Sequence, residues 1–144
     1  MRILVIHGPN LNMLGERETE TYGTVDLETI DATLKAMAEK EGVEVECVQS
    51  NHEGEIAERI QKAKGAFDAI ILNPAAFTHT SVTIRDAVAA AGVPTIEVHL
   101  SNVYAREAFR HHSYVAPVAV GQITGFGAQS YTLALRAALD LSGK

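Results

Sequence analysis

The sequence predicts an α/β protein with a flavodoxin-like, doubly wound sheet of five parallel strands in the order 2-1-3-4-5, in three αβα layers. Two observations carry this prediction. Short apolar runs alternate with amphipathic stretches of helical period along the whole sequence. Most of these runs are mainly apolar, as expected of strands that helices cover on both faces. A chain of 144 residues without a linker, repeat or low-complexity stretch is expected to form a single domain, residues 1–144.

The five expected strands are short, and all but one are mainly apolar without a strict alternation. The exception alternates apolar and polar residues, as a strand with one wetter face does. The expected strands are residues 3–7, 43–49 (the alternating one), 67–73, 93–99 and 116–122.

Amphipathic segments between these strands predict the helices. The segment 27–42 has Leu27, Ile30 and Leu34 at helical spacing and stops at Gly42. Ser81 stands where the helix 81–92 needs an N-cap. The other expected helices are 53–65, a short one at 103–109, and 127–143.

Composition excludes several kinds of protein. Twelve Lys and Arg against eighteen Asp and Glu leave a net charge of −6, which argues against a nucleic-acid partner. No apolar run approaches the roughly 20 residues that span a membrane, and no signal-peptide pattern is present. The single cysteine, Cys47, excludes an internal disulfide and suits a reducing compartment. We therefore expect a cytoplasmic protein that binds neither membranes nor nucleic acid.

Polar side chains gather where the strands end. In doubly wound sheets the ligand lies beyond the carboxyl ends of the strands, at the point where strand order reverses. The connection after the first strand, 8–25, is far longer than the usual about 2–6 residues. These ends carry Asn10, Asn12, Arg17, Tyr22, Asn73, His79, His99, Ser101 and Asn102.

The long loop is interpreted as a lid that carries a base. A tyrosine, with an ordinary pKa of about 10, acts as a base only if that pKa is lowered. The guanidinium of Arg17 within about 4–6 Å of Tyr22 would lower it, so the base would form only when the lid closes. Surface loops also hold such residues by chance, and this alternative stays open.

His99 ends a buried strand opposite this loop. The backbone N–H groups of Leu100, Ser101 and Asn102 lead into a short helix and could bind an anion. A carboxylate held there would bring His99 close enough to act as a general acid on a departing hydroxyl. A purely structural role for His99, and capping roles for Asn73 and His79, remain the alternatives.

Several cofactor signatures are missing. The sequence has no GxGxxG after the first strand, no GxxxxGK[ST], and no metal-ligand spacing such as HExxH. The five lysines lie on expected helix faces or in the tail, away from the sheet edge where a Schiff base would form. We expect neither a cofactor nor a metal.

Four segments, HGPNLNMLGERETETYG, LNPAAFTHTS, EVHLSN and FRHHS, closely resemble the type II 3-dehydroquinate dehydratases in order and spacing. The resemblance covers essentially the whole chain. It implies conversion of 3-dehydroquinate to 3-dehydroshikimate and water, in the shikimate route to aromatic amino acids. It also implies that the reaction uses no cofactor or metal.

The resemblance assigns roles to individual residues. Tyr22 matches the base that removes a proton beside the ketone, and Arg17 matches the arginine that stabilises this base and the transition state. Asn12 matches the residue near which a water assists the enolate. His99 matches the acid that protonates the leaving hydroxyl. The residues that match substrate-binding groups are Asn73, His79, Leu100, Ser101 and Arg110.

The resemblance further implies an assembly of trimers into a dodecamer. In it, Asp86 matches a residue that a neighbouring subunit supplies, although Asp86 by itself suggests only a solvated helix face. One alternative function remains at this point, a non-catalytic module that binds a small acid or a nucleotide on the same sheet. The pair Arg17 and Tyr22 distinguishes the two hypotheses, because a binding module does not need it.

Overall fold

The computed structural model describes residues 1–16, 19–22 and 24–141, except for the side chains of Thr19 and Tyr22. Five parallel strands form one sheet in the order β2-β1-β3-β4-β5. This confirms the predicted fold class and strand order. The strands are β1 (Arg2–His7), β2 (Glu44–Gln49), β3 (Ala69–Asn73), β4 (Thr95–His99) and β5 (Gly121–Thr124).

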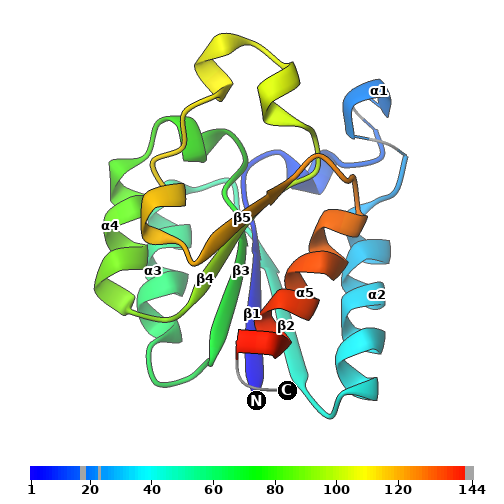
Figure 1. Cartoon of the computed structure of the whole chain (residues 1–144), viewed down its shortest axis with the longest axis vertical. Coiled ribbons are helices and arrows are strands. Elements are labelled where there is room, and N and C mark those ends of the chain that lie inside the picture. Colours follow the sequence, from blue (N-terminus) through cyan, green and yellow to red (C-terminus); the bar gives the residue numbers. More distant parts are fainter. Residues whose placement is uncertain (17–18, 23, 142–144) are drawn as a thin grey trace.

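Helices cover both faces of this sheet, as Figure 1 shows. Alternate side chains of β1 point to opposite layers: Ile3 and Val5 join the core under α2 and α5, whereas Leu4 and Ile6 join the core under α3 and α4. This two-sided burial explains why residues 3–6 of β1 and 69–72 of β3 are apolar at consecutive positions. The helices are α2 (Leu27–Lys40), α3 (Glu53–Ala63), α4 (Val82–Ala91) and α5 (Gln129–Leu141).

The caps of α4 follow the sequence signals. The Ser81 hydroxyl accepts a hydrogen bond from the backbone N–H of Ile84, which confirms the predicted N-cap. Gly92 ends the helix in the left-handed conformation, with φ 68°, that glycine adopts without steric cost. No helix in the described part of the chain is long and apolar enough to cross a membrane.

The predicted strand 116–122 is wrong at its start. Residues Ala116–Val118 form a 3-10 turn, η5, and pairing with β4 begins only at Gly121. The hydroxyl of Ser113 accepts hydrogen bonds from the N–H groups of Val115 and Ala116, which closes a turn there. The run is apolar because it packs into the core beside α4, and not because it is extended.

The connections at the carboxyl ends contain short helical turns. The predicted helix 103–109 is two 3-10 turns, η3 (Val103–Ala105) and η4 (Ala108–Arg110). The long first connection contains the 3-10 turn η1 (Leu11–Met13) and the single turn α1 (Thr19–Tyr22). Together with η2 (Ala75–His79), these segments lie at one end of the sheet, where they can surround a ligand (Figure 1).

Candidate active site

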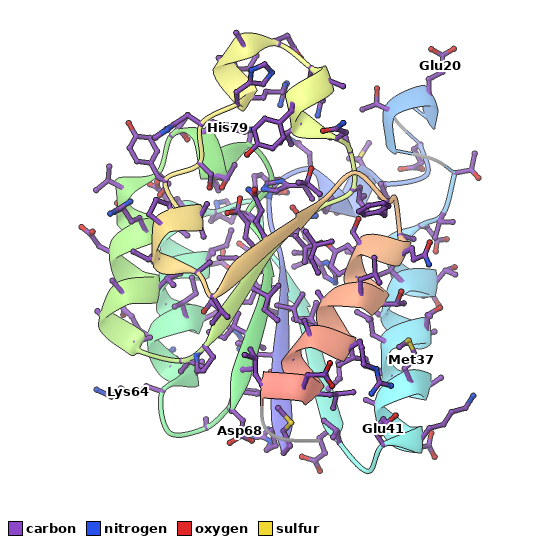
Figure 2. All side chains as sticks on the ribbon, in the orientation of Figure 1. Glu20, Met37, Glu41, Lys64, Asp68 and His79 are labelled. Atoms are coloured by element: carbon purple, nitrogen blue, oxygen red, sulfur yellow. The ribbon has the colours of Figure 1, made fainter. Side chains whose placement is uncertain are left out.

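A cavity of about 150 Å³ opens at the carboxyl ends of the central strands, at the predicted place. His79, on η2, marks this end of the molecule in Figure 2, whereas Lys64 and Asp68 lie at the opposite end. The cavity is lined by Pro9, Asn10, Leu11, Asn73, Ala75, Ala76, His79, His99, Leu100, Ser101, Val103, Arg106 and Arg110.

Just after β1, the backbone of Gly8 lies too close to the backbone of Asn73 and Pro74 for a side chain to fit. The N–H of Gly8 donates to the carbonyl of Asn73 at 2.8 Å, and a Cβ on Gly8 would lie only 2.8 Å from that oxygen. Asn10 and Ala75 adopt positive φ values of 68° and 51°. Such strained backbone persists only where the surroundings hold it, and here it borders the cavity.

The side chain of His99 is hydrogen-bonded to a buried carboxylate. His99 Nε2 lies 2.5 Å from Glu97 Oε2, and Glu97 is fully buried. The hydroxyl of Thr78 donates to the same oxygen at 2.6 Å, and Ser113 donates to the carboxylate at 2.9 Å. Burial alone would raise the pKa of Glu97, but the hydrogen bonds from His99, Thr78 and Ser113 and the charge of His99 hold it below its usual value.

This arrangement determines which nitrogen of His99 can react. An ionised Glu97 only accepts hydrogen bonds, so His99 Nε2 carries a proton and donates it to the carboxylate. The ring borders the cavity, and Nδ1 is therefore the nitrogen that can exchange a proton with a ligand. The carboxylate stabilises the positive charge that the ring carries when both nitrogens are protonated.

Glu97 is a residue that the sequence reasoning missed. Glu97 and His99 are two positions apart on β4, so their side chains share one face of the strand. An acid inside an otherwise apolar buried strand, two residues before a histidine, was the available signal. Buried carboxylates are almost always paired, and the nearest titratable partner on that face was His99.

His79 lies beside His99 in the cavity wall. The two rings stack with centroids 6.3 Å apart, and His79 Nδ1 is 2.8 Å from the carbonyl of His112. Burial, and then the charges of His99 and Arg110, lower the pKa of His79. His79 is thus held in its neutral form, in which one ring nitrogen donates and the other accepts.

Two arginines line this wall, and both lie within 4 Å of the carboxylate of Glu107. Arg110, which was predicted, has its Nε 3.0 Å from Glu107 Oε1. Arg106, which was not, donates from Nη1 to the Ser101 hydroxyl at 3.2 Å, so it reaches the residues that follow β4. Arg106 lies at the C-cap of the 3-10 turn η3. The predicted regular helix over 103–109 gave no reason to expect Arg106 in the site.

The remaining predicted residues have separate positions. Asn12 is exposed on η1, beside the cavity residue Leu11, and Asp86 is exposed on α4. Neither is among the cavity-lining residues in the described part of the chain. Arg17 lies outside the described residues, and so does the side chain of Tyr22, whose backbone ends α1.

Among the described residues, one group could hold a metal ion. Nitrogen, oxygen and sulfur atoms of His7, Asp31 and Cys47 lie within 4.8 Å of one another, behind the cavity and outside its lining. Burial, followed by the charge and hydrogen bonding of Asp31, raises the pKa of the Cys47 thiol to about 12. The thiol therefore keeps its proton at neutral pH in the metal-free protein.

The fold and this cavity together define a class: α/β proteins that bind a small polar ligand at the switch point of a parallel sheet and place a histidine–carboxylate pair against it. The chain belongs to the class II dehydroquinase family, since the family model for "Dehydroquinase class II" matches residues 1–139. This confirms the resemblance that the four sequence segments indicated.

Known relatives agree with this assignment. A 3-dehydroquinate dehydratase of Geotalea daltonii is 61% identical over 137 residues, which is 95% of each chain. That of Desulforudis audaxviator is 57% identical over 98% of this chain and 94% of its own. The crystal structure of type II dehydroquinase from Butyrivibrio crossotus is 47% identical and superimposes with a TM-score of 0.94, covering 96% of this chain and 97% of that one.

Proposed function

We propose that this chain is a hydro-lyase that converts 3-dehydroquinate to 3-dehydroshikimate and water, as a step of aromatic amino acid biosynthesis. The observation that carries the proposal is the pairing of His99 with Glu97 in the wall of a polar cavity, in a chain of this family. At roughly 10–15 Å³ for each water-sized site, the cavity volume of about 150 Å³ suits a ligand of about a dozen non-hydrogen atoms. A small cyclic acid such as 3-dehydroquinate has that size.

The first step is removal of a proton from the carbon beside the ketone. We assign this step to Tyr22, acting as a phenolate that the guanidinium of Arg17 stabilises. The carbon–hydrogen bond breaks, the proton passes to the tyrosine oxygen, and the electron pair moves into an enolate. A water held by Asn12 donates a hydrogen bond to the enolate oxygen.

The second step is loss of the hydroxyl. The enolate electrons form the new carbon–carbon double bond as the carbon–oxygen bond breaks, and His99 Nδ1 gives a proton to the leaving oxygen. Glu97, bonded to the other nitrogen, stabilises the ring while it carries both protons. The products are 3-dehydroshikimate and water, so the reaction balances without an oxidant or a reductant.

The substrate carboxylate and hydroxyls need fixed donors. We assign the carboxylate and the adjacent hydroxyl to Asn73 and to the backbone N–H groups of Leu100 and Ser101, and the other hydroxyls to His79 and Arg110. All five residues line the one cavity, and Asn73, Leu100 and Ser101 are buried. Buried donors at fixed positions bind oxygen atoms at a small entropic cost.

We propose that the working form is a dodecamer of four trimers in the cytoplasm. Asp86 is exposed on α4 and does not line the cavity of its own chain. It would therefore contact substrate only in the site of a neighbouring subunit. The free thiol of Cys47 suits a reducing compartment. Neither nucleic acid nor a membrane is part of the proposal.

Turnover of purified protein, treated with a chelator, tests the reaction directly through the ultraviolet absorbance of the conjugated product. Tyr22→Phe should lower kcat by about 10²–10⁴, the usual contribution of acid–base catalysis, and should leave binding intact. A variant that kept more than about a tenth of the kcat would refute the assignment of the base. Binding of 3-dehydroquinate without turnover would instead indicate the non-catalytic module.

Mixed oligomers test the role of Asp86. Asp86→Ala protein and Tyr22→Phe protein are denatured together and refolded, so that some sites combine an intact Tyr22 with a neighbour's intact Asp86. Activity should exceed the sum of the two variants refolded separately. Simple additivity at every mixing ratio, or a fully active monomer in sedimentation, would exclude a shared site.

A further inference from the structure

A line of hydrogen bonds leads from the cavity through the core to Asp31 on α2. Asn73 Nδ2 donates to the hydroxyl of Tyr131 at 3.0 Å, and that hydroxyl lies 2.8 Å from His7 Nδ1. His7 Nε2 lies 2.7 Å from the carboxylate of Asp31. Of these four residues only Asn73 borders the cavity, so the proposed reaction leaves the other three without a role.

The line crosses from the sheet into one helix layer. His7 and Asn73 are register partners at the ends of β1 and β3, while Tyr131 lies on α5 and Asp31 on α2. His7 and Tyr131 are fully buried, and Asp31 is half-buried. Buried polar groups lower the stability of a protein unless each has a hydrogen-bond partner. The hydrogen bonds of this line are therefore needed for these residues to be tolerated in the core.

The direction of each hydrogen bond can be derived. The Oδ1 atom of Asn73 accepts from the N–H of Ala75 at 3.0 Å, which identifies the other amide atom as the nitrogen donor to Tyr131. Burial, the largest effect, raises the pKa of Tyr131, so its hydroxyl keeps its proton. Because this hydroxyl already accepts from Asn73, its own proton is free to go to His7 Nδ1.

The far end of the line agrees with this direction. Burial alone would raise the pKa of Asp31, but hydrogen bonds from His7 and Cys47 and the nearby charge of Lys35 hold it below its usual value. Because His7 Nδ1 accepts the proton of the Tyr131 hydroxyl, the ring proton lies on Nε2 and is donated to the carboxylate of Asp31. Every donor then points from the cavity toward Asp31.

This order fixes what Asn73 presents to a ligand. One N–H of its Nδ2 is committed to Tyr131, and its oxygen is committed to Ala75. The second N–H of Nδ2 remains for the cavity. A flipped amide would place its oxygen against Tyr131 and its nitrogen against the Ala75 N–H, which would set two donors against each other.

We propose that Tyr131, His7 and Asp31 are positioning residues that hold the Asn73 amide so that the cavity meets a hydrogen-bond donor and never an acceptor. The inference rests on the proposed function, in which Asn73 binds substrate oxygens. A fixed donor suits the carboxylate and hydroxyl oxygens of 3-dehydroquinate, whereas a flipped amide would present its oxygen and repel the carboxylate. The line therefore affects substrate binding and has little effect on the rates of the chemical steps.

Tyr131→Phe removes one oxygen and breaks the line at its centre. KM for 3-dehydroquinate should rise about tenfold while kcat changes less than about threefold, the pattern of lost uniform binding. Thr95→Val is the matched control, because its buried hydroxyl donates only to Val93 at the opposite end of β4. The control should lower the melting temperature by a similar amount and leave KM unchanged. Equal KM in Tyr131→Phe and wild type would overturn the inference.

A double variant separates this inference from the proposed function. Asn73→Ala alone should raise KM, and Tyr131→Phe should add nothing to KM in that background, since the positioned group is gone. If Asn73→Ala leaves KM unchanged, the assignment of Asn73 to the substrate is wrong. If Asn73→Ala raises KM but Tyr131→Phe adds the same factor in both backgrounds, only the positioning role is wrong. A wild-type chain without turnover would overturn the proposed function and the inference with it.

Two substitutions of His7 provide a second test. Gln carries one acceptor and one donor, as the neutral imidazole does, whereas Leu has similar bulk and neither group. His7→Gln should keep the wild-type KM, and His7→Leu should raise it about tenfold; equal KM values would contradict the proposal. Nitrogen NMR of the wild-type ring supplies a readout that does not depend on activity: it should show a proton on Nε2 alone, and a proton on Nδ1 would reverse the line and refute it.

Discussion

The molecule contains two histidine–carboxylate pairs of similar construction at one end of its sheet. His99 ends β4 and His7 ends β1, and each bonds through Nε2 to a carboxylate, Glu97 at 2.5 Å or Asp31 at 2.7 Å. In both pairs the pKa of the acid is held below its usual value. The pairs differ in their surroundings: His99 lines the cavity and has its Nε2 bonded to Glu97, whereas Nδ1 of His7 is bonded to Tyr131 and His7 does not line the cavity.

This difference shows that a histidine–carboxylate pair is not by itself a catalytic signature. A histidine transfers protons only if its second nitrogen can reach a reacting atom. When a buried hydroxyl occupies that nitrogen, the same pair sets the direction of a hydrogen-bond line instead. The surroundings of Nδ1 therefore separate chemistry at His99 from positioning at His7.

The largest expected difference between the pairs is in kcat. His99→Gln should lower kcat by about 10²–10⁴, the usual loss when a general acid is removed. The same substitution at His7 should leave kcat within about threefold of wild type, because Gln keeps a donor and an acceptor. Steady-state kinetics of both purified variants measure this. Comparable losses of kcat at the two positions would mean that His99 and His7 do not differ in their roles.

Removing the charge of each acid should separate the pairs by a smaller factor. A hydrogen bond to a charged group contributes about 1.5–3 kcal/mol, which corresponds to roughly 10–100-fold in rate if it is needed in the transition state. Glu97→Gln should lower kcat by that factor, while Asp31→Asn, which can still accept from His7, should not. The kcat of the two isosteric variants, measured side by side, decides the point.

Acid stability should show what the two pairs share. A carboxylate whose pKa is lower in the folded than in the unfolded state contributes stability above its unfolded pKa, near 4.5 for Glu97 and 3.8 for Asp31. That contribution is lost as pH falls through the folded value. Denaturant unfolding should show wild type losing stability more steeply than Glu97→Gln or Asp31→Asn below about pH 4.5. Parallel curves for all three proteins would mean that neither acid is held ionised by folding.

The smallest expected effect is none at all. Among the lysines in the described part of the chain, none lines the cavity, so no imine with substrate should form. Borohydride added with 3-dehydroquinate should leave activity and protein mass unchanged. A mass adduct of substrate size on a lysine would replace the enolate with an enamine and overturn the proposed first step.

Much of the architecture was predictable from the order of residues. Alternating apolar and amphipathic segments indicated the parallel sheet, its strand order and the place of the cavity, because these depend on local periodicity and on short connections. Asn73, His79, His99, Leu100 and Ser101 follow strands or flank short turns, so rules about strand ends located them in the cavity wall, whereas Arg110 was indicated by the family resemblance alone. The start of the fifth strand was misplaced because Ser113 closes a turn that apolar periodicity cannot reveal.

The sequence by itself thus determined the sheet, the site and, through four family segments, the reaction class. Only the tertiary structure decided the partners of the buried groups. Glu97 lies in a mainly apolar strand and Asp31 on a helix face. Each binds at least one group that is far away in the sequence. Tyr131 is separated by 124 positions from His7 and by 58 from Asn73. Such contacts depend on how the layers pack in three dimensions, which the local sequence pattern does not encode. Packing removes these groups from water, so each of them needs a hydrogen-bond partner.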